Sequence, residues 1–499
     1  MRKSPTALFL FLAMPVLALA QDLKEFEKRV TEFTLGNGMH FIVLERRGAP
    51  VASMVLYANV GSANDPAGRT GLAHMFEHMA FKGTDTLGTT NWQEEQKALA
   101  EIEAIYDKLD AEKNKGPRGS AETIKKLEAD LKAAIDKANS FVVKEAYSEI
   151  VSRNGGVGMN AFTSGEATVY HYSLPSNRIE LWFLLTSQIF RQPILREFYA
   201  ERSVVRQERS RGVESSQQGK MMEALMTAAF LAHPQRSVGG WASDIENLRA
   251  KEGEEFFRKY YVPSNLVAVV SGDVDPNEMK RLADQHFSKL ASGPTPPRVI
   301  TEEPRQEGER RITVESPGQP LIYMGYKRPA TMHADNPALA ILAGALSSGR
   351  TGVLYKEMVE KQKISLQAVA IPSFPTSKYP GIFTFIAVPA VGKTVDENQK
   401  AIEGIIEGVK KDKLEAAAID RIKTQVRASL IRALDSNMGM AQQLAANYML
   451  YGDWRKMFTR IQDIEKVTAD DVQRVARTYL IDSARTIVIS KQPVKGDGK

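Results

Sequence analysis

Cysteine is absent from the 499-residue sequence. Its absence excludes a disulfide scaffold, a cysteine-ligated zinc or iron–sulfur site, a cysteine nucleophile and a lipid anchor on cysteine. Any metal ion would have to be held by histidines and carboxylates. Histidine is itself scarce, with only seven in the chain, so each can be considered individually.

Long basic runs and long apolar runs are also absent from the body of the chain. The formal net charge is +6, and it falls to +4 without Arg2 and Lys3. So weak a bias argues against a nucleic-acid partner. No segment after the first 20 residues reaches about 18 consecutive apolar residues, so we expect no stable membrane span in the mature protein. The length predicts two or more globular domains.

The first 20 residues, MRKSPTALFLFLAMPVLALA, have the pattern of a secretory signal peptide. A basic start (Arg2, Lys3) precedes an apolar run that Pro15 interrupts and that ends in the small residues Ala18 and Ala20. This pattern predicts cleavage after Ala20. An uncleaved membrane anchor is the alternative, although the run is short for a bilayer. An exported chain without cysteine suits a periplasmic or secreted protein.

Strand patterns and helix patterns are segregated along the first half and do not strictly alternate. Residues 33–45, FTLGNGMHFIVLE, carry a Gly-Asn-Gly turn signal between alternating segments and predict a β-hairpin. Residues 51–62 predict another strand. Residues 92–142 are highly charged with helical periodicity, broken near residues 115–119, which predicts two long helices joined by a turn. We interpret them as a solvated helical insertion that takes no part in chemistry.

The second half of the chain repeats the first. Residues 244–271 align without gaps on residues 463–490 at a constant offset of 219, with identities that include Asp244/Asp463, Tyr260/Tyr479 and Ser271/Ser490. Residues 292–310, rich in proline and polar residues, are typical of a linker. The sequence therefore predicts an α+β protein of two homologous α/β-sandwich halves, residues 21–291 and 311–499, with the helical insertion in the first.

The segment GLAHMFEHMAFKGT, residues 71–84, carries the strongest chemical signal. Apolar residues at 72, 75, 76 and 79 predict an amphipathic helix. His74 and His78 are four residues apart, so they project from one face and can bind a single zinc ion. Glu77, beside them, can accept a proton from a zinc-activated water. The pattern HxxEH is the inverse of the HExxH zinc-peptidase motif.

A catalytic zinc ion usually has three protein ligands. The acidic helical segment at residues 195–214 offers three candidates, Glu197, Glu201 and Glu208, of which the last two share a helix face. Spacing alone does not choose among them.

Three motifs in order, HMFEHMAFKGT, GGVGMNAFTSGEATVYHY and ERSVVRQE, resemble those of the pitrilysin/insulinase family of zinc metallopeptidases, which includes the mitochondrial processing peptidases. The resemblance implies a single Zn²⁺ per chain, held by His74, His78 and Glu208 in the first half only, with Glu77 as the catalytic base. It implies that Glu201 orients a ligand histidine, and that Asn160 and Ala161 lie on an edge strand that binds peptide substrates. The interval from His78 to Glu208 is longer than is usual in the family, and the helical insertion accounts for the excess.

One departure from the family pattern concerns the second half. Family members that supply substrate contacts from that half carry an arginine and a tyrosine where this chain has Val359 and Leu366, while Arg350 and Tyr355 are out of register. Some family peptidases pair a zinc-bearing subunit with one that carries this Arg/Tyr pair. The departure therefore predicts a homologous partner without zinc, or else a homodimer.

The resemblance implies a zinc endopeptidase that cleaves peptides or unfolded segments inside a clamshell chamber, and the signal pattern places it in the periplasm or outside the cell. Two alternatives remain open: a noncatalytic assembly or scaffold subunit of the same fold, and a peptidase specialised for one precursor.

Overall fold

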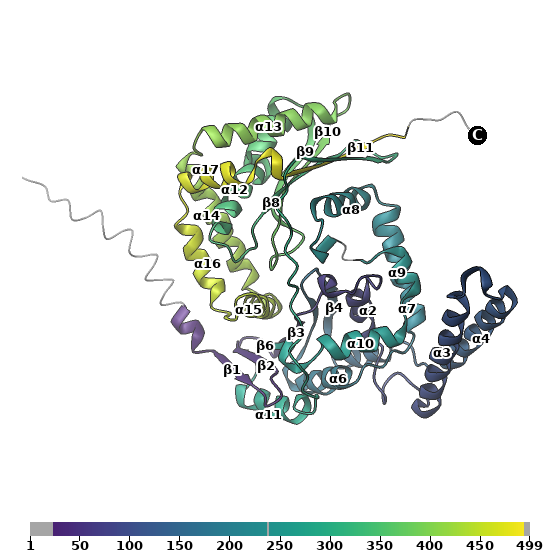
Figure 1. The fold of residues 1–499 in the computed structure, drawn as a ribbon. Helices are drawn as coiled ribbons and strands as arrows, with labels where there is room; N and C mark the ends of the chain where they lie inside the picture. The colour runs from purple at the N-terminus through teal and green to yellow at the C-terminus, as the bar shows by residue number, and fades with distance from the viewer. Residues whose placement is uncertain (1–22, 237–238, 494–499) are drawn as a thin grey trace, which may run out of the picture.

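The computed structural model describes residues 23–236 and 239–493, so the predicted signal peptide lies outside the described residues. Two β-sheets, one from each half of the chain, form the framework (Figure 1). The first sheet has the order β1-β2-β6-β3-β5-β4. Its strands are β1 (Val30–Thr34), β2 (His40–Glu45), β3 (Val51–Ala58), β4 (Val157–Thr163), β5 (Thr168–Pro175) and β6 (Leu266–Gly272).

The predicted hairpin is formed by β1 and β2, which pair antiparallel around a turn where Gly38 takes a φ of +94°. Strand β2 then pairs in parallel with β6, and β6 pairs antiparallel with β3. Strand β4 lies at the edge of the sheet, bonded on one side to β5. One edge of the first sheet is thus formed by the strand that carries Asn160 and Ala161.

The second sheet repeats this topology with the order β7-β11-β8-β10-β9. Its strands are β7 (Arg310–Glu315), β8 (Ile322–Arg328), β9 (Ser365–Phe374), β10 (Gly381–Pro389) and β11 (Arg485–Lys491). Strand β11 is parallel to β7 and antiparallel to β8, as β6 is to β2 and β3. Strand β6 maps onto β11 at the predicted offset of 219. The predicted α+β architecture with two homologous halves is confirmed.

Helices cover both faces of each sheet. In the first half they are α2 (Leu72–Met79), α3 (Trp92–Lys113), α4 (Ala121–Asn139), α5 (Ala146–Arg153), α6 (Ile179–Arg191), α7 (Phe198–Arg209), α8 (Gln217–Ala229), α9 (Ala242–Asn247), α10 (Ala250–Tyr260) and α11 (Pro276–Phe287). In the second half they are α12 (Asn336–Ser347), α13 (Val395–Lys411), α14 (Ala416–Ala433), α15 (Asn437–Tyr451), α16 (Lys456–Glu465) and α17 (Ala469–Tyr479). Helix α17 is the copy of α10 at the offset of 219. None of the helices in the described part is long and apolar enough to span a membrane.

Each half contributes a helix to the sheet of the other half. Alternate residues of a strand point to opposite faces, so Phe41 of β2 packs against α6 and α11, whereas Ile42 packs in one cluster with Met440 and Leu444 of α15. Reciprocally, Leu225 of α8 packs on the second sheet. Helices α8 and α15 correspond to each other in the repeat, so the interlock is symmetric and joins the halves through two apolar cores.

The predicted insertion is a helical hairpin of α3 and α4, which projects from the first half on the side away from the second sheet (Figure 1). Its helices share a small apolar cluster that includes Ile102 and Leu131. Residues between α11 and β7, within the predicted linker, form no helix or strand.

Candidate metal centre

Helix α2 positions the HxxEH residues by burying its other face. Leu72, Met75, Phe76 and Met79 are buried in the first core, while His74, Glu77 and His78 are only partly buried. The helix begins after Gly71, whose φ of +100° suits glycine.

The partly buried carboxylate of Asp65 caps the start of α2. Asp65 accepts hydrogen bonds from the backbone N–H of Gly71 at 2.7 Å and of Ala73 at 2.9 Å, which satisfies two free donors of the first turn. Burial raises the pKa of Asp65 to about 7, although these two donors oppose the rise. The cap fixes the direction in which α2 leaves the preceding loop.

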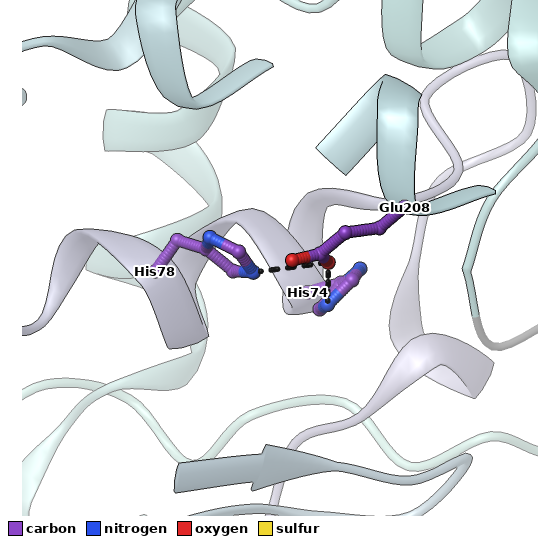
Figure 2. Close-up of side chains that lie close together, drawn as sticks. All are labelled: His74, His78 and Glu208. Carbon is purple, nitrogen blue, oxygen red and sulfur yellow. Dashed lines mark ion pairs between the residues drawn. The ribbon is translucent and has the colours of Figure 1, made fainter. Parts of the chain in front are cut away.

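His74, His78 and Glu208 come together although 130 residues separate the second histidine from the glutamate (Figure 2). Oε2 of Glu208 lies 3.5 Å from Nε2 of His74 and 3.4 Å from Nε2 of His78. One ligand atom from each residue lies within 4.8 Å of the others. Bonds of about 2.0–2.2 Å to a tetrahedral zinc ion would place ligand atoms roughly 3.3–3.6 Å apart. The two imidazoles and the carboxylate therefore fit a zinc ion.

Glu201 lies on the opposite edge of the His78 ring. Its Oε2 is 3.1 Å from Nδ1 of His78, and its Oε1 is 2.5 Å from Nζ of Lys82. Burial disfavours its charge, but the hydrogen bonds from His78 and Lys82 keep the pKa of Glu201 below its usual value. When Nδ1–H of His78 donates to this carboxylate, Nε2 is left free to bind a metal.

The two histidines differ in charge preference. Burial and the neighbouring His78 lower the pKa of His74. Burial also acts to lower the pKa of His78, but the carboxylates of Glu201 and Glu208 outweigh it and raise that pKa. Nδ1 of His74 is buried and has no hydrogen-bond partner among the described residues. Only His78 is therefore held by a carboxylate on the side away from Glu208.

A cavity of about 260 Å³ adjoins His78. Glu77, Asn160 and Ala161 all line it. Asn160 lies opposite His171 on β5, and β4 has a register irregularity just before Asn160. The structure thus places the predicted base and the predicted substrate-binding residues around one space.

Sequence reasoning missed several residues that line this cavity. They are Phe81, Lys82, Val142, Val143, Glu145 and Ala146, whereas Glu197, a candidate third ligand from the sequence, also lines the cavity. Lys82 is one helical turn beyond His78, a spacing that would have placed it beside the site. Glu145 and Glu197 both take positive φ values, 56° and 58°, at the starts of α5 and α7. Val142 and Val143 are at the end of the helical insertion, which therefore reaches the site.

The second half has no equivalent set of ligands on the corresponding helix. Helix α12 occupies the place of α2 and reads NPALAILAGALS, without histidine or carboxylate. Within residues 23–236 and 239–493, the His74–His78–Glu208 group is the one cluster of three or more His, Asp or Glu residues that could hold a metal.

Two family models match the chain in succession. A model of the insulinase family (peptidase family M16) matches residues 41–115 and 121–238, and a model of the peptidase M16 inactive domain matches residues 247–426. The zinc protease PqqE of Helicobacter pylori is 28% identical over 470 residues, which are 92% of this chain and 92% of that protein.

Solved structures share the fold. The crystal structure of a protease from Helicobacter pylori has a TM-score of 0.77 and 26% identity, covering 93% of this chain and 99% of that one. The periplasmic protease PqqL of Escherichia coli has a TM-score of 0.66 and 15% identity, covering 93% of this chain and 48% of that one.

Proposed function

Because the chain belongs to the insulinase family, peptidase family M16, we propose that it is a zinc-dependent endopeptidase with His74, His78 and Glu208 as ligands of one Zn²⁺. The observation that carries the proposal is the convergence of both Nε2 atoms on Oε2 of Glu208 at 3.4–3.5 Å. Relatives named as zinc proteases support the choice of metal.

Glu77 is the general base of this proposal. Zinc, when bound, would supply an activated water and polarise the peptide carbonyl. Glu77 takes the proton from the attacking water and transfers it to the leaving amine, which it can do because it lines the cavity beside His78. Glu201, which pairs with Lys82, holds the His78 ring in place during these steps.

The substrate is a peptide or an unfolded segment. Strand β4 is bonded on one side only, so an extended peptide can add to its free edge by backbone hydrogen bonds. Asn160 and Ala161 would lie along that peptide beside Glu77. Recognition through the backbone suits an enzyme that cleaves varied sequences, and we propose a clamshell chamber that admits unfolded chains.

Location and partners are further parts of the proposal. The signal-like first 20 residues support a periplasmic or secreted enzyme that carries no stable membrane span once they are removed. Leu366 stands on β9 at the position where the family pattern has tyrosine, and its side chain is exposed. We therefore propose a homologous subunit without zinc, or a second copy of the chain, as the source of the missing Arg/Tyr contacts.

A noncatalytic subunit is the second candidate function, because a model described as an inactive domain matches residues 247–426. The complete HxxEH motif in the first half favours catalysis over this candidate. A peptidase specialised for one precursor would use the same residues and differ only in substrate range.

Metal content and peptide hydrolysis test the proposal. We expect one zinc per chain in the purified protein, hydrolysis of unstructured peptides that a chelator abolishes, and recovery on adding Zn²⁺. The assay is run with and without any homologous protein encoded beside it. A chain that holds no zinc and cleaves nothing in either case would overturn the proposal in favour of the noncatalytic alternative.

Glu77→Gln isolates the base from the metal. We expect zinc content to stay at one per chain while the rate of peptide cleavage falls by about 10²–10⁴-fold, the usual contribution of a general base. Unchanged turnover in the variant would remove Glu77 from this role.

A further inference from the structure

The helical insertion joins the first half next to the metal centre. Its two ends are bonded to each other: Thr90 N–H donates to Phe141 O at 2.8 Å and Val143 N–H donates to Gly88 O at 3.0 Å. The helical hairpin therefore begins and ends at the same place in the first half, directly after the loop that follows α2. From there, α3 runs beside α7 (Figure 1).

Arg196 connects the base of the insertion with the loop after α2. Its guanidinium is 1% exposed and donates through Nε to Glu95 Oε1 at 2.6 Å and through Nη2 to Glu95 Oε2 at 3.0 Å. It also donates to the carbonyls of Lys82 at 2.7 Å, Leu87 at 3.1 Å and Thr84 at 3.1 Å. These five bonds use all five N–H donors of arginine.

The loop after α2 is shaped around this guanidinium. Gly83 and Gly88 take φ values of +91° and +89°, and a Cβ atom on either would lie 3.0 Å or 2.9 Å from Nη1 of Arg196. Arg196 stands two residues before the start of α7. One buried side chain thus fixes the end of α2, which carries His78, relative to the start of α7, which carries Glu201.

A second contact links the insertion to α7 one turn further on. The Tyr106 ring of α3 stacks on Tyr199 of α7 with centroids 4.6 Å apart. The guanidinium of Arg202 lies 4.9 Å from the Tyr199 ring centroid and donates to the Tyr106 hydroxyl at 3.0 Å. Tyr199 and Arg202 precede and follow Glu201 in the sequence. Helix α3 therefore contacts α7 at the turn that carries the carboxylate bonded to His78.

We propose that the helical insertion is a brace for the metal centre, and that Glu95 and Arg196 are positioning residues that set the spacing of α2 and α7. This inference rests on the proposed zinc site and adds a role that the sequence did not suggest. The ligand atoms come from two helices, and each must stay within a few tenths of an ångström of its place to bind zinc. A brace at the junction of both helices meets that requirement.

Glu95→Gln tests the brace. The variant keeps the shape of the side chain but leaves the buried Arg196 without its counter-charge, so the guanidinium and the three carbonyls must rearrange. We expect the zinc dissociation constant, measured by competition with a chromophoric chelator, to rise at least tenfold. We expect kcat for a test peptide to fall by a similar factor while KM stays within twofold, because β4 is untouched.

Glu309→Gln is the control in the second half, where Arg485 also pairs with Glu403 and Asp482. It removes a carboxylate that pairs with Arg485, a 10% exposed arginine of the second half. This control should lower thermal stability but leave the zinc dissociation constant within twofold. Glu95→Asp should keep zinc binding within threefold of the unaltered chain, because it keeps a carboxylate as the counter-charge of Arg196.

Each outcome decides the inference. Folded Glu95→Gln with unaltered zinc affinity and kcat, or an equal loss of zinc affinity in Glu309→Gln, would overturn the brace while leaving the proposed function intact. If Glu95→Gln does not fold, Tyr106→Leu replaces it, with about fivefold weaker zinc binding expected and unaltered binding as the contrary result. Failure of the unaltered chain to bind zinc would overturn the proposed function, and the brace with it.

Discussion

The hydrogen bond between His78 and Glu201 offers a quantitative test of the metal centre. Oε2 of Glu201 is 3.1 Å from Nδ1 of His78, and Oε1 is 2.5 Å from Nζ of Lys82. Glu201→Gln keeps the size of the side chain and one oxygen acceptor, but it removes the charge. A hydrogen bond to a charged group stabilises by about 1.5–3 kcal/mol, against about 1 kcal/mol for a neutral one.

A loss of about 1–2 kcal/mol would raise the zinc dissociation constant roughly 5- to 30-fold, at about 1.4 kcal/mol per factor of ten. Losses of this kind are typical when the hydrogen-bond partner of a ligand histidine is removed. The measurement is a competition titration with a chromophoric chelator. It is made at pH 8, because Glu201 also raises the pKa of His78 and protons would compete with zinc at lower pH.

Glu197→Gln is the control for this prediction. Glu197 lies 3.4 Å from Nζ of Lys82 and lines the same cavity, so its replacement changes the local charge equally. Glu197 forms no hydrogen bond or ion pair with either site histidine in the described part of the chain, and we expect less than a threefold change in zinc affinity. Equal losses in the two variants would refute the argument, because the effect would then come from net charge and not from the orientation of His78.

Three further predictions concern stability and substrate binding. Since burial raises the pKa of Asp65 from 3.8 to about 7, the folded chain binds this proton more tightly than the unfolded chain, and the resulting stability is lost as the pH rises through 7. We expect the free energy of unfolding of the zinc-free protein, measured with urea, to fall between pH 4.5 and 7.5. The fall should be about 3 kcal/mol larger in the unaltered chain than in Asp65→Asn. Parallel pH profiles of the two proteins would contradict this. Asn160→Ala should raise KM for a test peptide roughly fivefold with kcat changed less than twofold, as loss of about 1 kcal/mol of binding requires, and an unaltered KM would remove Asn160 from the substrate site. Leu444→Ala should lower the free energy of unfolding by about 2–5 kcal/mol in denaturant unfolding, since this fully buried residue of α15 packs against the first sheet. A loss below about 1 kcal/mol would show that this packing contributes little to stability.

Local patterns in the sequence were enough to predict much of the fold. The Gly-Asn-Gly turn and the alternation around it predicted the β1–β2 hairpin, because both signals act over a few residues. The offset of 219 predicted the repeated topology. The exchange of α8 and α15 between the halves was not predictable, because an amphipathic pattern shows that a helix buries one face but not which sheet it covers.

The helical insertion shows the same limit at the functional site. Its charge predicted a solvated arm, and most of α4 is indeed exposed. The interpretation that the arm stands apart from the site was nevertheless incomplete, because Glu95 is fully buried against Arg196. Neither residue is unusual in the sequence, since 25% of the chain is charged. What distinguishes Glu95 and Arg196 from surface charges is their contact in the folded chain, and they are 101 residues apart in the sequence.

The choice of the third ligand depends on the two nitrogen atoms at opposite edges of the His78 ring. Helical spacing placed Glu201 and Glu208 on one face of α7, about 10.5 Å apart along the axis for seven residues, so both could reach α2. The structure puts the His78 ring between them, with Glu201 at Nδ1 and Glu208 at Nε2. Of the two, Glu208 is the one that also approaches Nε2 of His74, and Glu197 pairs instead with Lys82 at the start of the helix. The geometry therefore favours Glu208 as the zinc ligand on grounds that are independent of family resemblance, and it leaves Glu201 to fix the ring that both carboxylates contact.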